Sequence, residues 1–409
     1  MAVFRYFLNA LANGFTMNHV KEEFLLKCED CGKAFFTLGE KTFYEEKGLA
    51  LPKRCKVCRE QRKLKWKESE ENQRKEKERV EFEKALSQVP YKVLLLSDFF
   101  NGVAEETLYV LGNGFDLMHG VKSSYYNFRD SLGKRNPLRN ALETYLQVND
   151  LWADFENALG NLDCSAMYDT LDMWLEDFGA YDEDAQAADY FCAIDAASTP
   201  SDTIMQDLPR RFQMWVDSLR LKNENKILEN IILPYAKFLT FNYTEFAETL
   251  YHIPPQNICY IHGCRKKKKG RPREKLILGH IPDAVDMEWG GNFPEYKSRH
   301  ADQMFYDATQ LLAEKFNWYS EAMTKDTQAI IKEYANFFDG LENIKNIVVI
   351  GHSLSKVDWG YFRQIIRCNK SIENVEWIFS CYNKKDLERI EVFLKNMDIH
   401  TERVKLLRI

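Results

Sequence analysis

Short apolar runs alternate with helical patterns after Pro90, and this alternation restricts the fold more than any other feature of the chain. Apolar spacing is helical between Tyr145 and Asn230 and again between Ala301 and Phe338. Strands that alternate with helices favour an α/β fold, with a parallel sheet covered on both faces and a helical insert at about 145–230. Runs rich in β-branched and aromatic residues predict strands at 108–111, 236–241, 258–261, 276–278, 347–350 and 375–379.

Two C-x-x-C pairs precede this region, Cys28-Glu29-Asp30-Cys31 and Cys55-Lys56-Val57-Cys58. Four thiolates at this spacing suit tetrahedral Zn²⁺, so Cys28, Cys31, Cys55 and Cys58 are predicted to hold a structural zinc ion. Redox-active pairs are the alternative, but those usually occur singly, at a helix start behind a strand. The segment resembles a small family of bacterial zinc ribbons. Its role, in protein contacts or in phosphate binding, stays open.

Composition divides the chain into four parts. The connector is rich in Glu, Lys, Arg and Gln and contains neither Gly nor Pro from Arg59 to Leu86, which predicts an exposed helix. The predicted parts are an amphipathic lead at 1–27, a four-cysteine zinc ribbon at 28–58, a charged helical connector at 59–90 and the α/β domain at 91–409.

Charge is segregated although the net charge is only −6. Residues 151–209 contain no Lys or Arg, whereas Lys53 to Lys67 is dense in both. This asymmetry is compatible with a nucleic-acid face, with two surfaces that dock in a homo-oligomer, or with solvated helix faces.

The sequence predicts no membrane partner and a cytoplasmic location. No stretch approaches the roughly 20 apolar residues that cross a bilayer. The opening residues resemble a signal peptide only loosely, because Arg5 and Asn9 interrupt the apolar stretch. Ten cysteines, six of them scattered, indicate a metal site and reduced thiols.

Polar residues follow several predicted strands directly. Gly112-Asn113-Gly114 with Asp116 follows the first strand, and a tight turn of this kind lets a backbone approach a ligand. Asn242, His262 and the Gly351-His352-Ser353 segment follow later strands. Because the carboxyl ends of parallel strands line one crevice, we expect Asn242 and His262 to face one cavity.

These motifs carry a family resemblance from about Leu108 to the C-terminus. Taken in order, they resemble the bacteriophage abortive-infection AbiH family, which in turn looks like a divergent branch of the sirtuin-like fold. The residues that carry it are Gly112 to Leu117 with Gly120, Tyr126 and Phe128, then 152–156, 241–244, His262-Gly263 and 350–354 with Asp358.

The sirtuin resemblance implies a Rossmann-like domain that binds NAD⁺ and, in phage defence, hydrolyses it. It implies catalytic roles for Asn242 and His262. It also implies NAD contacts for Gly112, Asn113, Gly114, Asp116, Gly351, His352 and Ser353. Two positions depart from the sirtuin pattern: Thr244 stands where an Asp is usual, and Asn113 replaces an Ala.

The resulting hypothesis is an antiphage effector that cleaves the nicotinamide–ribose bond of NAD⁺, the expected substrate, and that a phage-derived trigger activates. One alternative is a nucleic-acid-binding or nucleic-acid-cutting defence factor that uses the zinc ribbon and the basic cluster. Another is a nucleotide sensor without turnover.

Overall fold

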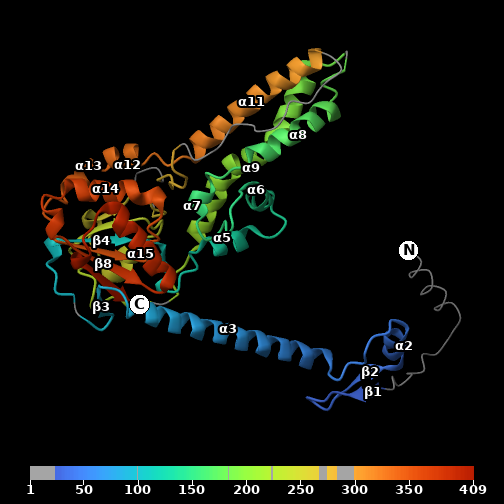
Figure 1. Ribbon diagram of the computed structural model, residues 1–409, viewed down its shortest axis with the longest axis horizontal. Helices are drawn as coiled ribbons and strands as arrows, with labels where there is room; N and C mark the ends of the chain where they lie inside the picture. The colour runs from blue at the N-terminus through green and yellow to red at the C-terminus, as the bar shows by residue number, and fades with distance from the viewer. Residues whose placement is uncertain (1–23, 99, 183, 223, 267–273, 283–298) are drawn as a thin grey trace. The chain divides into compact units, whose positions relative to one another are not determined.

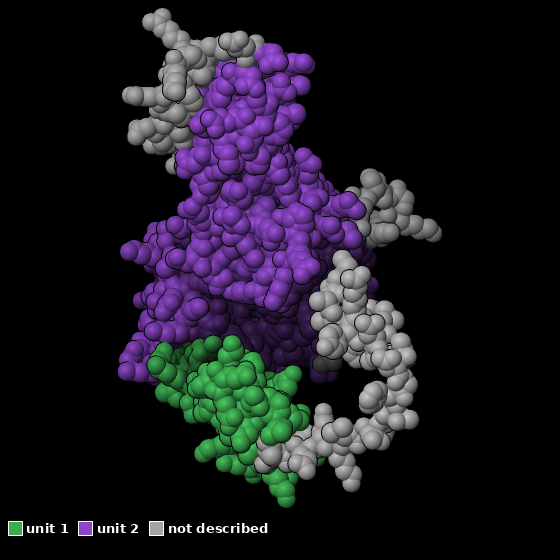
Figure 2. All heavy atoms as spheres, turned by 90° about the vertical axis from the view of Figure 1, so that its right-hand side faces the viewer, with its two compact units in different colours: residues 1–83 green, residues 84–409 purple. Residues whose placement is uncertain are grey.

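The computed structural model describes residues 24–98, 100–182, 184–222, 224–266, 274–282 and 299–409. Most of the amphipathic lead predicted at 1–27 lies outside these residues. The chain divides into two compact units, Met1–Glu83 (unit 1) and Lys84–Ile409 (unit 2), which Figure 2 shows in separate colours. Within the described part of the chain, no helix is long and apolar enough to span a membrane.

Unit 1 consists of a short hairpin and two helices. The antiparallel strands β1 (Phe24–Lys27) and β2 (Ala34–Thr37) precede α2 (Leu38–Glu46). Thr37 caps α2 through a reciprocal capping box with Glu40. The long helix α3 (Lys56–Leu86) runs through the predicted charged connector.

Unit 2 is built on a sheet of seven strands whose neighbours all pair in parallel, so the predicted α/β class with a parallel sheet is confirmed. The strand order is β3-β9-β8-β7-β4-β5-β6. The strands are β3 (Lys92–Leu95), β4 (Thr107–Leu111), β5 (Lys237–Thr240), β6 (Ile258–Tyr260), β7 (Asn346–Ile350), β8 (Glu376–Cys381) and β9 (Val404–Arg408).

Across the sheet, the six strands β6-β5-β4-β7-β8-β9 follow the 3-2-1-4-5-6 order of the doubly wound Rossmann fold. β3 adds a seventh strand at the edge, beside β9. In this order the chain leaves β4 toward β5 and β6 and later returns to its other side at β7. The point of reversal therefore lies between β4 and β7, where open α/β sheets leave a crevice at the carboxyl ends of the strands.

Apolar residues on both faces of the sheet explain its burial. Ile378 of β8 joins a cluster with Tyr109 and Phe238 on one face. Its neighbours Trp377 and Phe379 point the other way, toward Phe393. Nearly continuous apolar strands such as the Ile347–Ile350 run suit this environment.

The helices of unit 2 form the cover of the sheet and an elongated insert. Figure 1 shows α8, α9 and α11 side by side, extending away from the sheet. The helices are α4 (Asn113–Met118), α5 (Tyr125–Leu132), α6 (Pro137–Tyr145), α7 (Phe155–Ala158), α8 (Cys164–Asp177), α9 (Ala187–Ser218), α10 (Phe246–Tyr251), α11 (Arg299–Met323), α12 (Thr327–Glu333), α13 (Ala335–Asp339), α14 (Trp359–Cys368) and α15 (Lys384–Met397). The 3-10 turns are η1 (Ala104–Glu106), η2 (Pro255–Asn257), η3 (Lys356–Asp358), η4 (Ile372–Asn374) and η5 (Thr401–Arg403).

One predicted strand is wrong. Residues 276–278 do not join the sheet. Instead, the Ile277 N–H donates to the carbonyl of His262 at 2.9 Å, and the Ile277 carbonyl accepts from the Tyr243 hydroxyl at 2.8 Å. The apolar run is therefore explained by burial beside His262 and not by strand pairing.

Candidate functional site

A cavity of about 1410 Å³ opens at the carboxyl ends of the central strands of unit 2. Its lining comes from the segments after β4, β5, β6 and β7, together with parts of the helical insert and the start of α15. The structure brings all nine predicted catalytic and NAD-contacting residues into this one lining: Gly112, Asn113, Gly114, Asp116, Asn242, His262, Gly351, His352 and Ser353.

The glycines hold two turns together at the floor of the cavity. The Gly114 N–H donates to the Gly351 carbonyl at 2.7 Å, and the Gly112 N–H donates to the Ile350 carbonyl at 3.0 Å. A Cβ on Gly112 would lie 2.5 Å from the Cα of His352, and one on Gly114 would lie 2.6 Å from the Cα of Gly351. Gly351 itself has a φ of +62°. The close approach of the two backbones thus requires glycine independently of any ligand.

Asn242 and Asp116 form one side of the cavity. Asn242 Nδ2 donates to Asp116 Oδ1 at 3.0 Å, and Thr244 Oγ1 donates to Asp116 Oδ2 at 2.6 Å. Burial raises the pKa of Asp116 to about 7, although these two hydrogen bonds oppose the rise. Thr244 therefore contacts a carboxylate that belongs to another part of the chain.

His262 lies in the same lining, after β6. Its side chain is 2 % exposed, and its Nε2 has no hydrogen-bond partner among the described residues. Burial, and then the nearby Lys325 and His352, lower its pKa well below the ordinary value. This environment favours the neutral imidazole, in which one ring nitrogen carries a free lone pair.

A second imidazole, His352, lies across the ring of Phe241. The Phe241 centroid is 5.1 Å from that of His262 and 4.3 Å from that of His352. His352 Nδ1 accepts the Leu354 N–H at 2.9 Å, so this ring has a fixed orientation. Burial and Lys325 lower the pKa of His352 to about 3.

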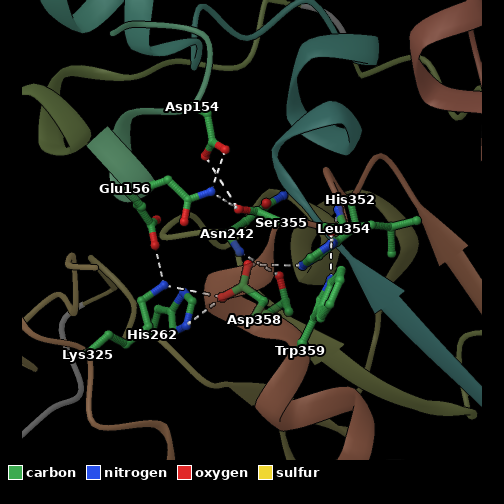
Figure 3. A network of polar contacts seen from close by, with 12 residues as sticks. Asp154, Glu156, Asn242, His262, Lys325, His352, Leu354, Ser355, Asp358 and Trp359 are labelled. Carbon is green, nitrogen blue, oxygen red and sulfur yellow. Dashed lines mark hydrogen bonds and ion pairs between the residues drawn. The ribbon is translucent and has the colours of Figure 1, made fainter. Parts of the chain in front are cut away.

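Asp358 faces both imidazoles. Its Oδ1 lies 3.7 Å from His262 Nε2, and its Oδ2 lies 3.5 Å from His352 Nε2. Figure 3 shows this carboxylate between the two rings. Asp358 belongs to the sequence motifs, but its role could not be predicted from them, because its position opposite both rings depends on the segment after β7.

Sequence reasoning missed Lys325, which completes this network. Its side chain is fully buried, and its ammonium contacts Asp358 Oδ1 at 3.2 Å and also Glu156 (Figure 3). Burial disfavours the charged amine, but the two carboxylates outweigh it and raise the pKa of Lys325. A lone lysine after a helix gives no signal in sequence. Only its burial beside two acids identifies it.

Three cavity-lining side chains have buried polar atoms without a partner among the described residues: Ser123 Oγ, Asn242 Oδ1 and His262 Nε2. An unsatisfied buried polar atom costs about 1–3 kcal/mol. Their presence in one cavity of ligand size indicates a binding site for a molecule with several hydrogen-bonding groups. Three exposed basic residues, Lys356, Lys385 and Arg389, also contribute to the lining.

Unit 1 holds the second site. Cys28 and Cys31 flank the turn between β1 and β2, whereas Cys55 precedes α3 and Cys58 lies in its first turn. The four Sγ atoms lie within 4.8 Å of one another. Backbone hydrogen bonds lower the pKa of Cys28 to about 6 against the effect of burial, while hydrogen bonding to Cys55 and burial raise the pKa of Cys58. These four convergent sulfurs fit a structural Zn²⁺ ion, which stabilises all four as thiolates.

Comparison with known families gives two matches. A family model described as "Bacteriophage abortive infection AbiH" matches residues 108–381, more than half of the chain. A second, described as "Probable treble clef domain", matches residues 24–66 and spans the four clustered cysteines. The placement of the second cysteine pair at a helix start agrees with that description. No curated protein matches the chain at a significant level.

Proposed function

The chain belongs to the bacteriophage abortive-infection AbiH family, and from this premise we propose that it acts in phage defence by hydrolysing NAD⁺ in the cavity between β4 and β7. The observation that carries the proposal is the set of unpartnered polar atoms of Ser123, Asn242 and His262 in that cavity. They line it at the point of the Rossmann-type sheet where dinucleotides are bound in other proteins.

The reaction proposed is NAD⁺ plus water giving ADP-ribose, nicotinamide and a proton. The bond between the nicotinamide nitrogen and the ribose breaks, and its electron pair leaves with nicotinamide. Water adds to the ribose carbon and releases a proton. The neutral His262 offers Nε2 as the acceptor for that proton, and Asp358, 3.7 Å away, stabilises the resulting imidazolium.

Asn242 and Asp116 have binding roles in this mechanism. Asn242 Oδ1 is a buried acceptor that suits a ribose hydroxyl or the attacking water. The Asp116 carboxylate already accepts from Asn242 and Thr244, and each oxygen keeps a lone pair for the carboxamide N–H of nicotinamide. The exposed Lys356, Lys385 and Arg389 suit the diphosphate.

The test measures NAD⁺ during phage infection in cells that carry the parent protein or a single-site variant. Asn242→Ala and His262→Ala should lower the rate of NAD⁺ loss by about 100-fold or more and abolish protection. Asn343→Ala and His400→Ala are matched controls, because both residues are exposed and lie outside the cavity lining. They should behave as the parent does.

Two results would contradict the proposal. One is unchanged NAD⁺ loss in folded Asn242→Ala and His262→Ala proteins. The other is tight NAD⁺ binding by the activated parent without release of nicotinamide, which would identify a nucleotide sensor instead of an enzyme.

A second candidate function, nucleic-acid binding, is favoured by one face of α3. Lys56, Arg59, Lys63 and Lys67 are exposed at helical spacing, and no acid pairs with them among the described residues. Farther along α3, the basic residues form ion pairs with Glu71, Glu76, Glu78 and Glu81. Steep salt dependence of RNA or DNA binding, lost when Lys63 and Lys67 are changed to Glu but not when Lys75 is, would support it.

A further inference from the structure

We propose that Lys325 is a positioning residue of the cavity: its buried ammonium holds the Asp358 carboxylate between His262 and His352. The inference rests on the proposed function for its catalytic meaning. Its structural content, a buried ammonium that fixes a carboxylate and keeps two nearby imidazoles neutral, is testable without any substrate.

The Asp358 carboxylate is bound by Lys325. One oxygen of this carboxylate is 3.2 Å from Lys325 Nζ and 3.7 Å from His262 Nε2. The other oxygen is 3.5 Å from His352 Nε2. A single carboxylate thus faces one ammonium and two imidazoles, and the ammonium is the only one of these three groups at hydrogen-bonding distance.

Lys325 is itself anchored through its backbone. Its backbone N–H donates to the carbonyl of His280 at 2.8 Å, directly after α11 ends. The next residue, Asp326, caps α12 by accepting the Ala329 N–H. The backbone is therefore held on both sides of Lys325, and the ammonium has little freedom to leave the carboxylates.

The second partner of Lys325 is anchored as well. Glu156 Oε1 accepts from the Tyr125 hydroxyl at 2.9 Å, and the Tyr243 hydroxyl, which donates to the Ile277 carbonyl, lies 3.4 Å from the same oxygen. Its other oxygen contacts Lys325. Glu156 lies on α7 of the helical insert, so Lys325 ties the insert to the turn after β7.

Lys325 acts through its neighbours, because its side chain is fully buried and does not line the cavity. Burial raises the pKa of Glu156 and of Asp358, and the ammonium opposes that rise. After burial, the same ammonium is the largest cause that lowers the pKa of His262 and of His352. The charged or titratable groups around this network are Glu156, Asp358, Asp154, His262, His352, Tyr125, Tyr243 and Tyr361.

The test follows the isotope-labelled histidine rings by NMR as the pH is lowered from 8 to 5, in the full-length parent, Lys325→Met and Lys325→Arg. In the parent, the His262 and His352 signals should stay those of neutral imidazole throughout. In Lys325→Met at least one of them should titrate within this range, since the opposing cation is gone. Lys325→Arg should restore the parent pattern. His262→Gln and His352→Gln assign the signals.

Lys345→Met is the matched control, because Lys345 pairs with Glu106 at an exposed surface. If Lys325→Met does not fold, the double variant Lys325→Met with Glu156→Gln removes the cation together with one of its two carboxylates. Asp358 then remains beside the two histidines, whose titration is measured. Folded Lys325→Met with histidines that titrate as in the parent would overturn the positioning role.

Activity gives an independent reading. NAD⁺ loss should fall about tenfold or more in Lys325→Met and return in Lys325→Arg. If the parent consumes no NAD⁺ but the histidine titration shifts as expected, the proposed function fails and the positioning role of Lys325 stands.

Discussion

Unit 1 gathers four cysteine sulfurs around a space that a metal ion would fill, whereas unit 2 gathers Glu156 and Asp358 around Lys325, a cation of the chain itself. Both sites bring groups of like charge close together, which is unfavourable without a counter-charge. The two sites differ in the source of that counter-charge, which would be a bound metal ion in unit 1 and is Lys325 in unit 2. We therefore expect the fold of unit 1 to depend on an external ion, whereas the Glu156–Asp358 pair of unit 2 has its cation in the chain.

The two sites also differ in how far apart their members lie in sequence. Cys31 and Cys55 are 24 residues apart, but Lys325 is 169 residues from Glu156. A metal-binding motif is recognisable because its spacing is local. A buried ion pair that joins distant segments has no such signature, and only the folded chain reveals it.

The largest effect should come from removing the metal of unit 1. Structural zinc contributes about 10–16 kcal/mol in small zinc domains, so Cys58→Ser or chelation should unfold residues 24–58. Hydrogen exchange should show lost protection there and unchanged protection in the sheet of unit 2. Cys192→Ser is the control, because that cysteine is exposed and outside the cluster. Full protection of residues 24–58 without metal would contradict the expected dependence of unit 1 on a metal ion.

A smaller effect is expected from removing the internal cation of unit 2. Lys325→Met leaves two buried carboxylates without their partner and should lower the free energy of unfolding of unit 2 by about 3–5 kcal/mol. Chemical denaturation measures this directly. Lys345→Met, in an exposed pair, should change it by less than about 1 kcal/mol. Equal effects of the two substitutions would remove the distinction between the buried and the exposed pair.

The smallest of the three effects concerns Asp116, a cavity carboxyl that has neutral donors and no ion-pair partner among the described residues. Its pKa rises from 3.8 to about 7 on folding, so the folded state binds its proton more tightly. This contribution to stability is complete below about pH 4 and is lost as the pH rises through about 7.

Between pH 5 and pH 8, the free energy of unfolding of the parent should therefore fall by about 3 kcal/mol relative to that of Asp116→Asn, as measured by urea unfolding. The variant lacks the titrating group and is therefore the reference for the parent. A difference between the two proteins that does not vary with pH would show that Asp116 is ionised throughout, as a carboxylate beside a cation would be.

Much of the fold was predictable because its signals are local. The alternation of apolar runs with helical segments located β4 to β8, and the charged composition indicated α3. The edge strand β3 and its neighbour β9 were missed, because both bear exposed or half-buried positions that dilute the apolar pattern. Residues 276–278 were mistaken for a strand because burial alone produces an apolar run.

The candidate site was predictable to a similar extent. Residues that follow parallel strands end at one edge of a sheet, which is why Asn242 and His262 were expected in one cavity and both line it. The two glycine turns were also expected to bound it. The contacts between these turns were not expected, because the close approach of Gly114 to Gly351 joins segments that lie far apart in the sequence.

The sequence by itself determined the parallel α/β class, the position of the cysteine site and the family to which the chain belongs, since each depends on the order and spacing of residues along the chain. Only the tertiary structure decided that Lys325 meets Glu156 and Asp358, and that Asp116 holds Asn242. The physical reason is that burial and charge act through space. A side chain acquires its partners and its pKa from whichever segments pack against it.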